Sequence, residues 1–277
     1  MTTPADVLPE LAEADAPASV IAVYGGLRAG SASPIAALIW RHIATHPGVI
    51  EEFWESLEPL FTSGQLPETA WRVARETVPQ GLLPRIEPRA QRLLGITQDD
   101  AVTIGTVAEA YNRANPANLL GILTLLARIT IGEQPEDGSS NARWSPPPVI
   151  TRSIPRMTPP AEMSTDLRWL LNDLRFGDRS QLEDVVPSLY RHLTDWPAYL
   201  AVLHIALAPR FCDGTVDTYA VRVERAMAKE ATALARQIRP APKLADMPQL
   251  QATMRRFASG FIPMMIVVGH AIAEQLE

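Results

Sequence analysis

One short stretch occurs twice in this chain, and the repetition constrains the fold more than any other feature. The sequence "IWRHIATHP" at residues 39–47 returns as "LYRHLTDWP" at residues 189–197. Aligning residues 40–76 with residues 190–226 gives 11 identities in 37 positions, where unrelated sequences of ordinary composition would give about two or three. The identical pairs are Arg41/Arg191, His42/His192, Pro47/Pro197, Leu57/Leu207, Pro59/Pro209, Phe61/Phe211, Gly64/Gly214, Ala70/Ala220, Arg72/Arg222, Val73/Val223 and Arg75/Arg225.

The offset between the copies, 150 residues, indicates a duplicated domain. It is far longer than the repeat unit of a solenoid. "LRAG" at residues 27–30 and "LRFG" at residues 174–177 extend the match upstream, after a three-residue change of offset. We therefore predict a pseudo-dimer in one chain: a first helical repeat (1–132), a proline-rich linker (133–165) and a second helical repeat (166–277), with the repeats packed about a pseudo-twofold axis.

The spacing of apolar residues predicts an all-α fold. In "PIAALIWRHIATH", "VIEEFWESLEPLF" and "PETAWRVARETV", apolar residues recur every three or four positions, as in amphipathic helices. Thr97 followed by Asp100 predicts the start of a helix that runs to about Asn112. Asn115 before Pro116 predicts the N-cap of a second, strongly apolar helix.

Composition excludes several classes of function. The net charge is −6, with 25 Lys and Arg against 31 Asp and Glu, so we expect no nucleic-acid partner. The single cysteine, Cys212, excludes an intramolecular disulfide and a thiolate zinc site, and it favours a cytoplasmic location. There is no basic, apolar leader and no uninterrupted span of about 20 apolar residues, so we expect no membrane association.

Two histidine arrangements have alternative interpretations. His42 and His46 stand four residues apart, as zinc ligands on a helix can. The second copy has tryptophan where His46 would recur, so we expect no metal site. The pairs Arg41-His42 and Arg191-His192 do recur, and a twofold axis could bring all four side chains to one central cavity. The alternative is that they only cover the interface between the copies.

The duplicated bundles, the proline-rich linker and the segments "AYNRANPANLL" and "VVPSLYRHLTDWP" resemble the group I, non-stereospecific 2-haloacid dehalogenases. The resemblance covers nearly the whole chain. It implies an all-helical fold with an active site between the copies and no metal or cofactor. In that family, a water held by an asparagine and activated by an aspartate displaces halide from C2 of a small halocarboxylic acid.

The resemblance places specific residues in this site. The asparagine that positions the water corresponds to Asn115, and a tyrosine of the family corresponds to Asn118. Ile35 and Leu38 replace bulkier aromatic residues of the pocket. The remaining correspondences are Phe261 at an aromatic position, Ala258 at a tyrosine position and Ser188 at a serine position.

The catalytic aspartate is the important departure. Alignment on Trp196-Pro197 puts Leu189 where the family has this general base. Asp184 and Asp195 are alternative bases, but they lie five residues before and six residues after that position, about 7 to 9 Å along a helix.

Three functions follow as alternatives. We expect an enzyme that binds a small carboxylic acid and has altered chemistry, because leucine cannot accept a proton. The others are an active hydrolytic 2-haloacid dehalogenase with a relocated base, and a non-catalytic binding or structural protein on the same fold. The sequence leaves open whether two chains form a homodimer.

Overall fold

The computed structural model describes residues 8–131, 144–175 and 185–276. Over these ranges the chain is all-α and contains no β-strand. The α-helices are α1 (Ala18–Gly30), α2 (Leu38–Ile43), α3 (Val49–Thr62), α4 (Gln65–Thr77), α5 (Pro88–Leu93), α6 (Gln98–Ile131), α7 (Thr165–Asp173), α8 (Ser188–His192), α9 (Pro197–Cys212), α10 (Thr215–Ala235), α11 (Pro242–Ala245), α12 (Pro248–Arg256) and α13 (Ile262–Gln275). A π-helical segment, Phe257–Phe261, joins α12 to α13, and two short 3₁₀ helices span Glu13–Asp15 and Pro160–Glu162.

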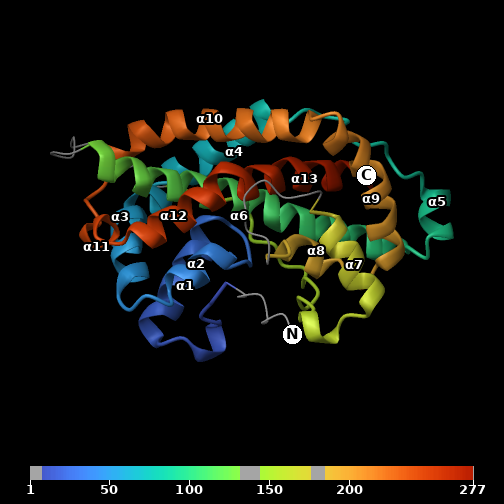
Figure 1. Cartoon of the computed structure of the whole chain (residues 1–277), viewed down its shortest axis with the longest axis horizontal. Helices are drawn as coiled ribbons and strands as arrows, with labels where there is room; N and C mark the ends of the chain where they lie inside the picture. Colours follow the sequence, from blue (N-terminus) through green and yellow to red (C-terminus); the bar gives the residue numbers. More distant parts are fainter. Residues whose placement is uncertain (1–7, 132–143, 176–184, 277) are drawn as a thin grey trace, which may run out of the picture.

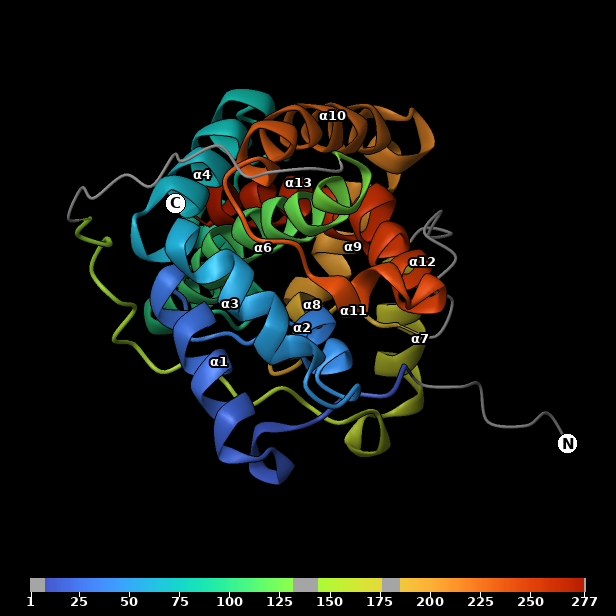
Figure 2. The ribbon, with the colours of Figure 1, turned by 90° about the vertical axis from the view of Figure 1, so that its left-hand side faces the viewer.

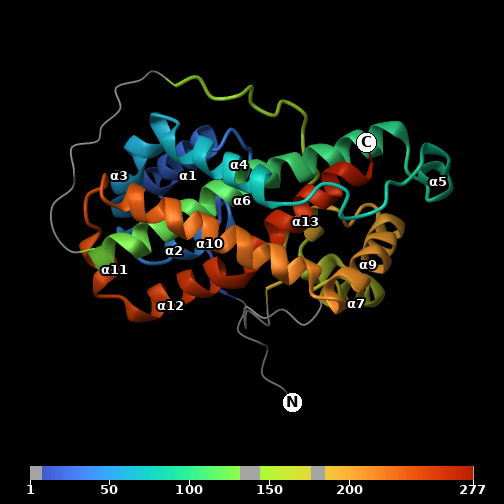
Figure 3. The same ribbon diagram turned by 90° about the horizontal axis from the view of Figure 1, so that it is seen from above.

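Two apolar helices, α6 and α13, form the centre of the molecule (Figure 1). Helices α4 and α10 cover one side of this pair, which Figure 2 shows nearly end-on. Seen from above, α1 to α3 with α11 and α12 lie at one end, and α7 and α9 lie at the other (Figure 3). Both central helices are apolar around most of their circumference because neighbours surround them.

Two apolar helical stretches also pass the length and composition test for membrane spans: α6, and the continuous run of α12, the π-helical segment and α13. They are Gln98–Ile131 and Pro248–Gln275. In each, 72% of the 18-residue window that passes the test is buried inside the molecule. Length and apolar composition are shared by membrane spans and by the core helices of globular proteins. Here the apolar surface of both helices packs against other helices of the same chain.

Helix α6 corrects the prediction of a helix that ends near Asn112 and a second one capped by Asn115. A single helix runs without a break from Gln98 to Ile131, with Pro116 in its interior. A proline inside a helix removes the hydrogen bond to the carbonyl four residues earlier, and its ring crowds that carbonyl, at a cost of about 3 kcal/mol or more. Packing on both sides of α6 evidently outweighs that loss, so Asn115 is an interior helix residue and not a cap.

The predicted start of α6 is confirmed. The Thr97 backbone N–H donates to an Asp100 carboxylate oxygen at 2.8 Å, and the Asp100 N–H donates to the Thr97 hydroxyl at 3.1 Å. This reciprocal pair satisfies two donors at the helix end.

Several contacts recur in the two halves at matched positions. Gly64 and Gly214 precede α4 and α10 with φ of 76° and 75°, a left-handed conformation that favours glycine. The corresponding helices also pack on each other, α4 on α10 and α6 on α13, as a twofold axis would require. These contacts agree with a duplication, while the pseudo-twofold axis and the domain limits stay predictions.

Candidate functional site

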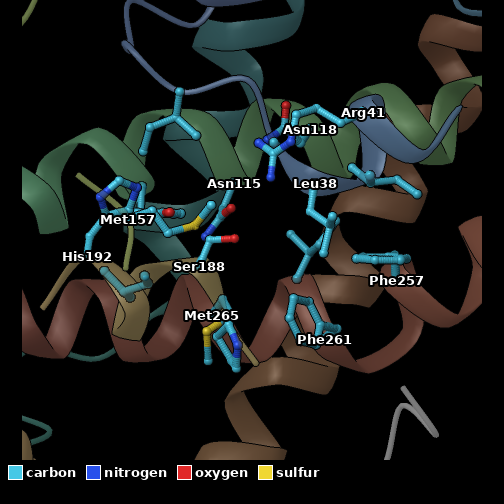
Figure 4. Close-up of a pocket in the computed structure, with 17 residues that line it drawn as sticks. Leu38, Arg41, Asn115, Asn118, Met157, Ser188, His192, Phe257, Phe261 and Met265 are labelled. Atoms are coloured by element: carbon cyan, nitrogen blue, oxygen red, sulfur yellow. The ribbon is translucent and has the colours of Figure 1, made fainter. Parts of the chain in front are cut away.

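A cavity of about 70 Å³ lies where the two halves of the chain meet. Its walls come from α2 and the residues before it, from the middle of α6, from α8, from the π-helical segment with the start of α13, and from one residue of the proline-rich segment (Figure 4). The volume is small against the 300–1,000 Å³ typical of sites for drug-sized ligands. It suits a molecule with only a few non-hydrogen atoms.

The structure brings together seven of the eight predicted site residues. In Figure 4, Asn115 and Ser188 lie on one side of the cavity, with Leu38 and Phe261 on the other. The predicted residues that line it are Ile35, Leu38, Asn115, Asn118, Ser188, Leu189 and Phe261. The eighth, Asp184, lies outside the described residues.

Two other positions considered from the sequence do not contribute to this cavity. Asp195 is exposed and is not part of the wall, and Ala258 is buried without lining it. Among the described residues, the wall therefore contains no aspartate or glutamate. At the position of the expected base, the Leu189 side chain is 1% exposed and packs in the core.

Asn118 presents a hydrogen-bond donor of fixed orientation. The indole Nε1 of the buried Trp40 donates to Asn118 Oδ1 at 2.7 Å. Because indole can only donate, this bond makes Oδ1 the acceptor and leaves Nδ2 as the other end of the amide. Nδ2 is buried and has no hydrogen-bond partner among the described residues. An unpaired buried donor in a cavity wall is satisfied when a ligand or a water binds there.

Tyr111 adds a second unpaired group. It lies one helical turn before Asn115 on α6, and its hydroxyl is buried with no hydrogen-bond partner in the part of the chain that the structure describes. Burial raises the pKa of Tyr111, so the phenol is neutral and can donate. Arg41 and the nearby Ser188 hydroxyl oppose this shift, although Ser188 does not reach hydrogen-bonding geometry with the phenol.

The charge around the cavity is positive. Arg41 lines the wall and pairs with Glu10 at 2.7 Å, while its guanidinium also donates to the Ala36 carbonyl. Arg191 is half-buried, donates to the Thr158 carbonyl at 3.2 Å, and pairs with no acidic side chain among the described residues. Burial lowers the pKa of Arg191, as expected for a cation partly removed from water. Two arginines against one glutamate favour an anionic ligand.

The recurring Arg-His pairs contribute one member each to the wall, Arg41 from the first half and His192 from the second. Both histidines make the same backbone contact. His42 Nδ1 lies 2.8 Å from the Pro9 carbonyl oxygen, and His192 Nδ1 lies 2.8 Å from the Pro155 carbonyl oxygen. No three His, Cys, Asp or Glu side chains are grouped as metal ligands in the part of the chain that the structure describes.

The aromatic part of the wall comes from the π-helical segment. Its i to i−5 hydrogen bond, from Ile262 N–H to the Phe257 carbonyl, widens one turn just before α13. Phe257 and Phe261 stack edge to face at 5.4 Å between ring centroids, and both line the cavity. Phe257, Met157 and Met265 are lining residues that sequence reasoning missed. A one-residue widening of a helix has no distinctive sequence pattern that could have revealed Phe257, and Met157 reaches the wall from the proline-rich segment, far away in the sequence.

The unpaired Tyr111 hydroxyl gives a stability prediction. Tyr111→Phe should raise the free energy of unfolding of the ligand-free protein by about 1 kcal/mol, because an unsatisfied buried polar group costs about 1–3 kcal/mol. Urea denaturation measures the change. Tyr190→Phe is the matched control, since the Tyr190 hydroxyl is also buried and unpaired but lies outside the cavity wall. Both variants should be stabilised, and only Tyr111→Phe should weaken binding of a small carboxylate. Equal affinity in both would remove Tyr111 from the site.

No family model matches the sequence, and no curated protein matches it. Solved structures do match. A D-2-haloacid dehalogenase mutant in complex with D-2-CPA is 17% identical, with a TM-score of 0.78 over 97% of this chain and 96% of the other. A D-2-haloacid dehalogenase with L-LA is 16% identical, with a TM-score of 0.75 over 100% and 99%. A further D-2-haloacid dehalogenase mutant is 15% identical, with a TM-score of 0.78 over 100% of this chain and 99% of the other. The chain therefore has a haloacid dehalogenase-like fold.

Proposed function

We propose that this chain is an enzyme that binds a small carboxylic acid in the cavity between its two halves and acts on it without a catalytic aspartate. The unpaired Asn118 Nδ2 donor is the observation that carries the proposal. Trp40 fixes the orientation of the Asn118 amide, and Asn118 is one of the residues that line the cavity. A carboxylate oxygen is a strong acceptor for this donor.

Charge, size and fold support the same ligand. The two arginines near the wall outnumber the one glutamate, which favours an anion. The apolar remainder of the wall, with Leu38, Phe261 and Met265, suits a short hydrocarbon or halogen substituent. The structures with the same fold are haloacid dehalogenases.

The altered chemistry follows from Leu189. Displacement at C2 by water requires a group that accepts a proton, and a general base typically contributes about 10²- to 10⁴-fold to such a step. Leucine cannot perform this role, and no carboxylate of the described residues replaces it in the wall. The same observation favours a second candidate function, a protein that binds the acid and does not transform it.

The test is calorimetry with racemic 2-chloropropionate, accompanied by a halide assay. We expect saturable binding of the acid and much weaker binding of 2-chloropropionamide, which has a similar shape and no charge. Chloride release should stay below about 1 s⁻¹, the lower end of ordinary enzyme turnover. Equal affinity for acid and amide would contradict the carboxylate site, and fast chloride release would contradict the altered chemistry.

A further inference from the structure

His192 lies in the cavity wall on the helix that carries Leu189. It is three residues further along α8, so both side chains project from the same face of that helix. Three residues correspond to about 4.5 Å along the axis. The imidazole also reaches further from the backbone than an aspartate side chain would. Figure 4 shows His192, Met157 and Asn115 on the same side of the cavity.

The hydrogen bond at Nδ1 determines where the ring can accept a proton. Nδ1 lies 2.8 Å from the Pro155 carbonyl oxygen, which can only accept, so Nδ1 carries the hydrogen. In the neutral ring the lone pair is then on Nε2. No hydrogen bond to Nε2 is found among the described residues. A residue on α8 therefore holds a free proton acceptor at the cavity.

The surroundings keep this ring neutral near pH 7. Burial lowers the pKa of His192, the positive charges of Arg191 and Arg41 act in the same direction, and the bond to the Pro155 carbonyl opposes them. Tyr111 faces the ring from α6 at 5.8 Å between centroids and is neutral. Glu10, the acidic group beside these arginines, already pairs with Arg41.

We infer that His192 serves as the general base in place of the missing aspartate, an inference that rests on the proposed function. Nε2 removes a proton from a water held by Asn115, and the water oxygen forms a bond to C2 of a 2-halocarboxylate. The carbon–halogen bond breaks and the halide leaves with its electron pair. The products are a 2-hydroxy acid and halide, and the imidazolium then returns its proton to solvent. Because His192 stands one turn from the family position, the reaction is slow.

The experiment measures bromide release from 2-bromopropionate, whose leaving group is better than chloride. The wild type should release bromide above the buffer rate but below about 1 s⁻¹. The rate should rise with pH through the lowered pKa of His192 and stay level at higher pH, because only the neutral ring accepts a proton.

His192→Asn removes the proposed base and keeps the hydrogen bond to the Pro155 carbonyl. The asparagine Nδ2 can still donate to the Pro155 carbonyl, but nothing replaces Nε2. Bromide release should fall about 10²-fold, within the range of a lost base. His42→Asn is the matched control, since His42 makes the same 2.8 Å contact to Pro9 and does not line the cavity. It should stay within about twofold of the wild type.

Three outcomes would overturn the inference while calorimetry still shows that 2-bromopropionate binds. These are no release above buffer, an unchanged rate in His192→Asn, and a rate that falls as the pH rises toward 8. Measuring the wild-type pH profile keeps the test valid if His192→Asn does not fold. Absence of binding would instead contradict the proposed function on which the inference depends.

Discussion

Replacing Leu189 with aspartate is expected to raise bromide release from 2-bromopropionate by about 10²-fold over the wild type. The substitution restores a carboxylate at the position that the family resemblance gives to the general base, next to Asn115 and on the same helix as His192. General bases typically contribute about 10²- to 10⁴-fold, and we expect the lower end because His192 already supplies part of this effect in the wild type.

The pH dependence of this gain has a definite sign. An aspartate at a site that is 1% exposed and lined by Leu38, Phe261 and Met265 is desolvated, so its pKa is raised above the ordinary value. Only the ionised carboxylate accepts a proton, so the gain should grow as pH rises through that raised pKa. Leu189→Asn is the control, because asparagine has the same shape as aspartate but cannot act as a base. If Leu189→Asp and Leu189→Asn release bromide equally from pH 5 to 9 while both bind the acid, the water does not sit at this position.

Replacing Asn118 with aspartate is expected to weaken binding of 2-chloropropionate by about 10²-fold at neutral pH. The change keeps an oxygen to accept from Trp40 and converts the free donor into a second oxygen. A lost hydrogen bond to a charged group costs about 1.5–3 kcal/mol, or roughly 10- to 100-fold in affinity, and repulsion between the two carboxylates adds to it. Calorimetry measures the affinity.

Two controls make the Asn118→Asp result specific. Lowering the pH should restore part of the affinity, because a protonated aspartate can again donate a hydrogen bond. Tyr190→Phe should leave affinity unchanged, since Tyr190 lies outside the wall. If Asn118→Asp folds with a cooperative melting transition and binds the acid as tightly as the wild type, the carboxylate is not held by Asn118.

Much of the fold was accessible from the sequence because the repeat and the helical spacing are independent of each other and agree. The matched glycines Gly64 and Gly214 have the same structural role, since both adopt a left-handed conformation at the start of a helix. One exception was the stretch 34–46, in which only Leu38–Ile43 is helical. Another was Asn115. Local pattern alone favours a cap before Pro116, whereas packing around α6 keeps one helix continuous through the proline.

The candidate site was predictable only in part, for a physical reason. Family resemblance named seven residues that the structure brings to one cavity, because it transfers positions along a shared fold. It could not supply the contact between Trp40 and Asn118, which joins residues 78 apart in the chain. It also could not show that His192 faces the cavity while His42 does not. Both facts depend on side-chain packing between distant segments.

The central claim is that a small carboxylate binds in this cavity against Asn118, and a crystal structure of the wild type with 2-bromopropionate tests it most directly. Anomalous scattering locates the bromine independently of the remaining density. We predict bromine against Leu38 and Phe261, and a carboxylate oxygen at hydrogen-bonding distance from Asn118 Nδ2, about 2.7–3.2 Å. Bromine bound only outside the cavity, or a carboxylate turned away from Asn118, would contradict the account.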